Sequence, residues 1–347
     1  MKNTQLKPTR NLSMEFCKLI AAVFVILIHV PLPGKLGGFT RCLARFAVPM
    51  FFAISGWFSC RADCEKLAGR IKHIFKLNVA ATLLYAVWGC CRAVCYGDSA
   101  AAYLRASLNT ASLMKWLLLQ QNPFAGHLWY LTAIFLCYLV LWAYVRFSDE
   151  KKVNYQPLYI VGACLLPVCL ACGELAAAVD VEIPYVLYRN AWFLGLPMFA
   201  MGIFLREYQE RIVGKFHLTT ARLTVLIFAG VLISVMQGWG VGIGELPIGM
   251  VLAVPALLLL MAAHPNIAGR SRMLARIVSS FGSLSTTIYV VHLMLSEIYA
   301  MLSWRFDQTL TAAEQEIWAA IAVICGSLAV SVLWEGIFRQ RRKAVSS

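Results

Sequence analysis

Residues 15–29 read Glu15-Phe-Cys-Lys18-Leu-Ile-Ala-Ala-Val-Phe-Val-Ile-Leu-Ile-His29, an apolar stretch that carries a glutamate, a lysine and a histidine. Eleven residues at about 100° each make three turns plus about 20°, so Lys18 and His29 share one helix face, about 16 Å apart. Glu15, three residues before Lys18, lies near the same face. Ionisable groups are costly inside a membrane helix, so this face is predicted to line a bundle interior and to be functional.

The composition agrees with a membrane protein. The chain has 347 residues, of which 60% are hydrophobic and only 14% charged, and its mean hydropathy is +0.70. Soluble domains are roughly half apolar and about a quarter charged. Apolar runs of membrane-spanning length predict an all-α, polytopic membrane helical bundle of about ten transmembrane helices, near residues 12–31, 43–60, 76–96, 127–146, 156–175, 190–206, 221–238, 246–263, 277–300 and 316–338.

The net charge is +14, and the positions of the lysines and arginines along the chain indicate the topology. If the N-terminus is cytoplasmic, 22 of the 31 lysines and arginines fall on the inner side, as the positive-inside rule requires. We therefore expect both termini to be cytoplasmic and no nucleic-acid partner. We expect a single transmembrane domain over residues 10–340, with short basic tails at 1–9 and 341–347. The twelve cysteines show no paired Cys-x-x-Cys spacing, so no metal site is expected.

A basic stripe follows the second apolar run. It comprises Arg70, Lys72, His73 and Lys76, in which Arg70, His73 and Lys76 recur every three residues along one helix edge. Such a stripe at the cytoplasmic mouth suits a phosphate-rich ligand. The alternative is anchoring at anionic lipid headgroups.

Further polar and aromatic residues fall near the outer ends of the predicted helices. Arg45 could hold an anionic acceptor or stabilise an oxyanion, or else contact headgroups. Tyr289 and His292 lie three residues apart near mid-membrane. Trp129 and Tyr130 could stack on a sugar, although such rings are also typical of the aromatic belt. The remaining candidates at the outer ends are His127, Arg189 and Asn190.

Five ordered motifs resemble the acyltransferase-3 family of bacterial membrane acyltransferases. They are Glu15-x-x-Lys18-x10-His29, Phe51-Phe52-Ala-Ile-Ser55-Gly56-Trp57 preceded by Arg45, a basic pair (His73 with Lys76 or Arg70 with His73), Leu128-Trp129-Tyr130-Leu131, and Ile288-Tyr289-Val-Val-His292. Two features depart from the family pattern. Lys18 replaces the usual arginine and cannot form a bidentate contact, and the basic pair replaces two arginines. Segments 45–49 and 189–193 also resemble the membrane halves of serine racemases from vancomycin-resistance clusters.

The resemblance implies an O-acyltransferase of the bacterial cytoplasmic membrane. It would move an acyl group, acetyl in particular, from cytoplasmic acyl-CoA to a hydroxyl of an exported or cell-envelope carbohydrate, with acetyl-CoA as a substrate and no tightly bound cofactor. In this scheme the basic stripe binds the donor phosphates, Lys18 lines the path, His29 is the general base or acyl carrier, and Arg45 stabilises the oxyanion. The acceptor contacts would be Glu15, His127, Trp129, Tyr130, Arg189, Asn190, Tyr289 and His292.

Two other functions remain open from sequence. One is a transporter of a small solute such as L-serine, or of an acyl group, without transferase chemistry. The other is a non-catalytic scaffold for envelope synthesis. The acceptor, the acyl length and the oligomeric state are not defined by the sequence.

Overall fold

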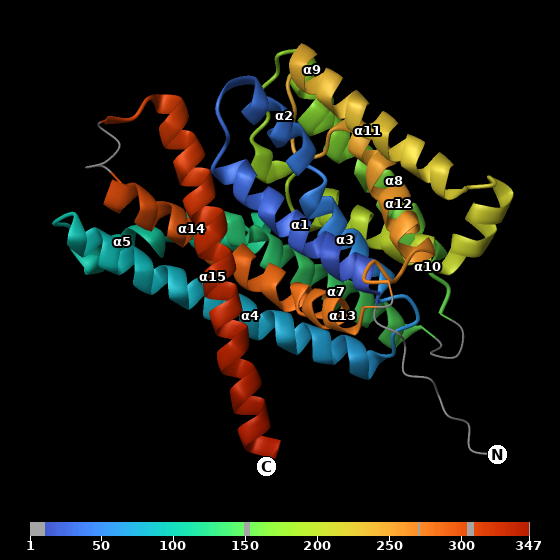
Figure 1. The fold of residues 1–347 in the computed structure, drawn as a ribbon, viewed down its shortest axis with the longest axis horizontal. Helices are drawn as coiled ribbons and strands as arrows, with labels where there is room; N and C mark the ends of the chain where they lie inside the picture. The colour runs from blue at the N-terminus through green and yellow to red at the C-terminus, as the bar shows by residue number, and fades with distance from the viewer. Residues whose placement is uncertain (1–10, 149–152, 270, 304–308, 347) are drawn as a thin grey trace.

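The computed structural model describes residues 11–148, 153–269, 271–303 and 309–346, and among these residues the regular structure is helical throughout (Figure 1). The predicted N-terminal tail, residues 1–9, lies outside them. The α-helices are α1 Leu12–His29, α2 Gly34–Ala44, α3 Ala47–Trp57, α4 Cys64–Cys95, α5 Ala100–Ser107, α6 Thr110–Leu119, α7 Trp129–Phe147, α8 Gln156–Leu170, α9 Ala176–Ala178, α10 Leu196–Lys215, α11 Thr220–Gly240, α12 Ile248–Ala263, α13 Arg272–Ser279, α14 Phe281–Ser303 and α15 Ala312–Ser346. Shorter 3-10 or π turns are η1 Gly126–Leu128, η2 Ala171–Leu175, η3 Tyr185–Leu187 and η4 Ala191–Gly195.

Seven of the ten predicted apolar runs coincide with described segments long and apolar enough to cross a membrane. The other three runs fall on α3, which has 11 residues, on η4 with α10, and on α12, which has 16 residues. The all-helical membrane fold is therefore confirmed. The number of ten spans, and the side on which the termini lie, stay predictions.

α3 lies at the centre of the bundle, where it packs against α1, α10 and α12. Its side chains Phe52 and Met50 are fully buried. A Cβ atom at Gly56 would collide with the carbonyl of Phe199, so glycine is what allows α3 and α10 to approach so closely. Three residues further along α10 and three residues back along α3, the close approach repeats, because a Cβ atom at Gly202 would collide with the carbonyl of Ala53.

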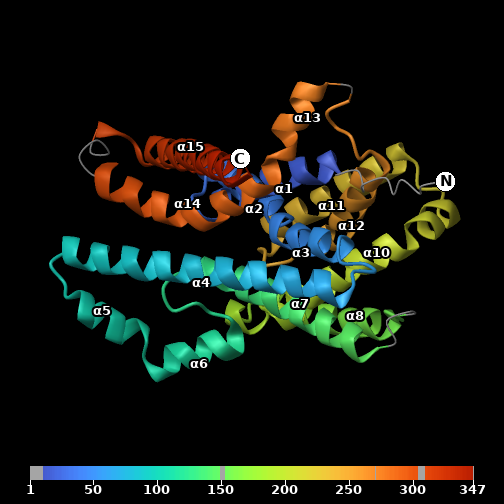
Figure 2. The same cartoon turned by 90° about the horizontal axis from the view of Figure 1, so that it is seen from below.

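The outward faces of the helices are apolar. On α11, Val225, Phe228 and Leu232 are each at least 59% exposed, at helical spacing. A helix that turns apolar side chains outward needs a lipid environment. Figure 2 shows α4 lying between the α14–α15 pair and the α5–α6 segment, and α5–α6 also exposes leucines, among them Leu117.

α4 begins twelve residues before the predicted apolar run. Asp63 caps it by accepting a hydrogen bond of 2.8 Å from the backbone N–H of Lys66. The basic stripe predicted for a cytoplasmic loop is therefore part of a 32-residue helix. At the other end of the chain, α15 continues as helix through residues 341–346, where a short tail is predicted.

Candidate active site

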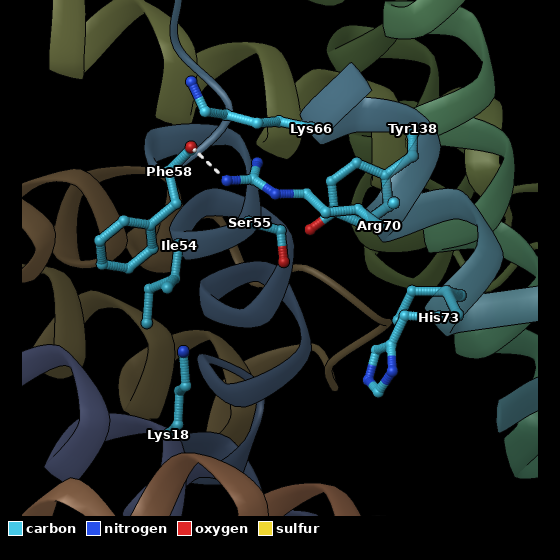
Figure 3. A pocket seen from close by; sticks show the side chains of 10 residues that line it. Lys18, Ile54, Ser55, Phe58, Lys66, Arg70, His73 and Tyr138 are labelled. Atoms are coloured by element: carbon cyan, nitrogen blue, oxygen red, sulfur yellow. Dashed lines mark hydrogen bonds between the residues drawn. The ribbon is translucent and has the colours of Figure 1, made fainter. Parts of the chain in front are cut away.

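A cavity of about 460 Å³ opens where α1, α3, α4 and α7 meet. Figure 3 shows Lys18 from α1, Ser55 from α3, and Lys66, Arg70 and His73 from α4 around it. Among the described residues that line it, none is an aspartate or a glutamate. We call this hollow the basic cavity; its lining is Lys18, Ile54, Ser55, Phe58, Lys66, Gly69, Arg70, His73, Ile74 and Tyr138.

Arg70 is held rigidly at the wall of the basic cavity. Its Nη1 donates to the hydroxyl of Ser59 at 2.6 Å and its Nη2 donates to the carbonyl of Phe58 at 2.8 Å. Both acceptors are neutral, so these bonds orient the guanidinium without cancelling its charge. Lys18 lies 3.5 Å from a carboxylate oxygen of Glu15, so Glu15 acts on the path through Lys18.

A second, narrower cavity of about 150 Å³ adjoins the basic cavity. Lys18, Ser55 and Ile74 line both hollows. The narrow cavity extends between α1, α3, α4, α7 and α14, and its lining includes Tyr130 and Tyr289. The two cavities therefore follow the face of α1 that carries Lys18, toward Tyr289.

Tyr289 connects the narrow cavity to three histidines. Its hydroxyl donates a hydrogen bond to the backbone carbonyl of His127, and its ring centroid lies 5.5 Å from the imidazole of His127. The imidazole centroids of His29 and His292 are 5.3 Å apart, those of His127 and His292 are 5.0 Å apart, and those of His29 and His127 are 6.4 Å apart. We call His29, His127 and His292 the histidine cluster.

The three histidines differ in exposure. His127 and His292 are buried, with 5% and 0% exposed, whereas His29 is exposed. Within the described part of the chain, neither ring nitrogen of His127 has a hydrogen-bond partner. Nε2 of His292 has none there either. Nδ1 of His292 lies 2.8 Å from the carbonyl of Tyr289, which fixes its ring. His29 is thus the member of the cluster that an external substrate can reach.

Two arginines flank the cluster and share one carboxylate. Nη1 of Arg45 lies 2.9 Å from one oxygen of Glu245, and Nη1 of Arg189 lies 3.5 Å from the other. The guanidinium of Arg189 also lies 5.5 Å from the ring centroid of Trp129, two residues after His127. Nε of Arg45 is buried without a described partner, so it keeps a free donor. Arg45 therefore belongs to an ion-pair group with Arg189 and Glu245, and we call the two arginines the arginine pair.

A buried carboxylate positions the loop that carries Glu245. Glu174, in η2, is 2% exposed. It accepts hydrogen bonds from the backbone N–H of Gly244 at 2.9 Å and of Leu246 at 3.0 Å, and from the side chain of Gln237. Because the two backbone donors flank Glu245, Glu174 fixes the carboxylate that binds the arginine pair.

Several predicted contacts have a different place. Lys72 and Lys76 are exposed and line neither cavity. Asn190 is buried and caps η4, where it accepts from the backbone N–H groups of Trp192 and Phe193 at 2.9 and 3.1 Å. In the structure its side chain therefore caps this turn, and its predicted contact with the acceptor stays a prediction.

Trp129 and Tyr130, the two rings predicted to stack on a sugar, face different parts of the structure. Trp129 is 6% exposed and faces the guanidinium of Arg189, at 5.5 Å from the ring centroid. Tyr130 turns the other way, into the narrow cavity, with its ring 4.8 Å from that of Phe52. Neighbouring residues on a helix point about 100° apart, so the two rings cannot form one stacking surface.

The fold and the site define a polytopic membrane protein with a polar path through its interior. The family model described as an acyltransferase domain, that of the acyltransferase-3 family, matches residues 11–335. The chain therefore belongs to the acyltransferase-3 family, as its motifs predict.

One curated relative is described as an amino-acid racemase of Enterococcus faecalis. It is 26% identical over 236 residues, which are 62% of this chain and 31% of the racemase. The match thus covers less than a third of that relative's length. It agrees with the resemblance seen in segments 45–49 and 189–193. No solved structure gives a significant match.

Proposed function

We propose that this protein moves an acyl group, acetyl in particular, from acyl-CoA to a hydroxyl group of an exported or cell-envelope carbohydrate. The observation that carries the proposal is the continuity of the path. Lys18 and Ser55 belong to both cavities, and Tyr289, at the far end, is bonded to the histidine cluster. A path of this kind suits a long donor with an anionic head and a thin arm.

The basic cavity is the proposed site of the donor's phosphates. Arg70 supplies a positive charge whose described partners are neutral, whereas Lys66 is ion-paired with Asp63 at 2.7 Å and Lys18 lies 3.5 Å from Glu15. His73 supplies a further donor. A fixed guanidinium is well suited to phosphate oxygens. Lys72 and Lys76, which lie outside the cavity, would add only long-range attraction at the mouth. The pantetheine arm of the donor would extend through the narrow cavity past Tyr130 and Tyr289.

The histidine cluster is the proposed site of transfer. His29 accepts the proton of the acceptor hydroxyl while that oxygen attacks the thioester carbonyl. The carbon–sulfur bond then breaks, and the coenzyme A thiolate leaves and takes the proton from His29. Nε of Arg45 donates to the oxyanion. In the alternative order, a ring nitrogen of His29 attacks first and carries the acyl group to the hydroxyl.

We further propose that the protein lies in the bacterial cytoplasmic membrane with ten spans and both termini in the cytoplasm. The support is the excess of lysine and arginine on the side of the basic cavity. Acyl-CoA would then enter from the cytoplasm, and the carbohydrate acceptor would meet His29 from the outer side.

The test uses membranes that contain wild-type protein, His29→Asn or His217→Asn, supplied with acetyl-CoA labelled in the acetyl group. His217 is an exposed histidine at the end of α10, and asparagine tolerates its positive φ of 48°, so it is the matched control. We expect His29→Asn to lower label transfer to surface glycan by about 10²- to 10⁴-fold, and His217→Asn to leave it unchanged. Equal transfer by all three proteins would contradict the role of His29. Label that crosses the membrane without joining a glycan would favour the transporter.

A further inference from the structure

A second large hollow lies on the face of the molecule where η3 and the 241–247 loop meet. Its volume is about 520 Å³. Two chain segments that are far apart in sequence form it, residues 172–188 and 241–244. We call it the acidic pocket, because its described lining includes Asp180 and Glu182 but no lysine or arginine.

Two tyrosines give the acidic pocket surfaces that suit a sugar. Tyr185 is 46% exposed, whereas Tyr188 is 7% exposed and packs against Gly173. Burial, together with the nearby carboxylates of Glu245 and Glu174, raises the pKa of Tyr188 to about 12, so its hydroxyl stays protonated and can donate a hydrogen bond. An exposed aromatic ring beside carboxylate acceptors and a hydroxyl donor matches the alternating apolar and polar faces of a pyranose.

The acidic pocket is physically connected to the transfer site. The guanidinium of Arg189 lies 4.0 Å from the ring centroid of Tyr185, and it lies 5.5 Å from the ring centroid of Trp129, two residues after His127 of the histidine cluster. Gly244 lines the pocket, and the next residue is Glu245, which binds the arginine pair. A ligand in the pocket would therefore lie against the group that flanks the exposed histidine.

We infer that the acidic pocket is a subsite for a carbohydrate chain that carries no negative charge, so that uncharged or amine-bearing sugars bind and uronic acids or phosphorylated sugars are rejected. This inference rests on the proposed transfer to a glycan and adds to it a location and a charge preference. The carboxylates of Asp180 and Glu182 repel anions, while Arg189, whose guanidinium lies against the ring of Tyr185, is ion-paired with Glu245 at 3.5 Å. The same carboxylates accept hydrogen bonds from sugar hydroxyls and attract an ammonium group.

The experiment uses the purified full-length protein in nanodiscs and saturation-transfer NMR with three probes. The probes are N-acetylchitotetraose, which is uncharged, chitotetraose, which carries amines, and tetragalacturonate, which is anionic. The variants are Asp180→Asn with Glu182→Gln, and Asp180→Lys with Glu182→Lys. Asp98→Lys is the matched control, because Asp98 is an exposed aspartate just beyond α4 and outside the pocket.

We expect the wild type and Asp98→Lys to bind the first two probes and not the third. The double substitution Asp180→Asn with Glu182→Gln should weaken the binding of chitotetraose about tenfold more than the binding of N-acetylchitotetraose. The double substitution Asp180→Lys with Glu182→Lys should allow tetragalacturonate to bind. Equal binding of all probes by all variants, or no binding of either non-anionic probe by the wild type, would overturn the subsite.

Acetyl-CoA binding is measured on the same samples to separate this inference from the proposed function. If acetyl-CoA binds but the sugars do not, the subsite is wrong and the donor half of the proposed function stands. If the sugars bind with the expected charge preference but acetyl-CoA does not, the subsite stands and the transferase assignment loses its donor.

Discussion

The basic cavity and the acidic pocket are of similar size, about 460 and about 520 Å³, but their linings have opposite charge. In the part of the chain that the structure describes, the lining of the basic cavity includes Lys18, Lys66 and Arg70 and no carboxylate. The lining of the acidic pocket includes Asp180 and Glu182 and no lysine or arginine. The comparison indicates two ligands of different charge that enter separate hollows. The histidine cluster is connected to one hollow through Tyr289 and to the other through the arginine pair.

Among the tests that compare the basic cavity with the acidic pocket, we expect the largest effect from substitution of Arg70. Arg70→Gln removes a fixed guanidinium from the basic cavity, and we expect the KM for acetyl-CoA to rise about 30-fold, or about 2 kcal/mol, with little change in kcat. Lys72→Gln is the matched control, since Lys72 is exposed on the same helix and does not line the cavity. Its effect should stay below about threefold. Equal effects of the two substitutions would mean that only general surface charge attracts the donor.

A smaller effect is expected on the side of the acidic pocket. Glu174→Gln replaces one acceptor oxygen with an N–H group, so one of the hydrogen bonds to Gln237, Gly244 or Leu246 is lost and the loop carrying Glu245 loosens. We expect kcat/KM for the acceptor to fall about tenfold, while the KM for acetyl-CoA is unchanged.

Glu210→Gln, at an exposed glutamate of α10, is the control for this prediction. A parallel loss of donor affinity and of thermal stability in Glu174→Gln would show that Glu174 supports the whole fold rather than positioning the arginine pair.

Helical periodicity predicts that Arg70 and His73 line the basic cavity, but it wrongly groups Lys72 and Lys76 with them. Relative to Lys66, Arg70 and His73 lie within about 40° on α4, whereas Lys76 is displaced by about 80° and Lys72 by about 120°. A spacing of three residues therefore drifts away from the cavity, while spacings of four and seven stay on it. The start of α4 at Cys64, set by Asp63, gives this register.

The arginine pair illustrates what one sequence cannot show. Arg45 and Arg189 are conspicuous as cations near helix ends, but Glu245 lies 200 residues from Arg45 and its loop has no motif. The same holds for His292. The sequence places it near mid-membrane and His29 at an outer end, yet the two rings lie 5.3 Å apart. The reason is that α1 ends after 18 residues, at His29, while α14 continues for eleven residues beyond His292.

The most direct test of the account is the side from which the donor enters. Wild-type protein is reconstituted in sealed vesicles in a single orientation, and proteolysis at the α3–α4 end establishes which orientation it is. Labelled acetyl-CoA is then supplied to one side of the vesicles at a time. The account predicts that coenzyme A is released only when acetyl-CoA is on the side where Lys66 and Arg70 open, and that labelled glycan appears on the opposite side. Release from the side of the acidic pocket, or glycan labelled on the same side as the donor, would contradict it.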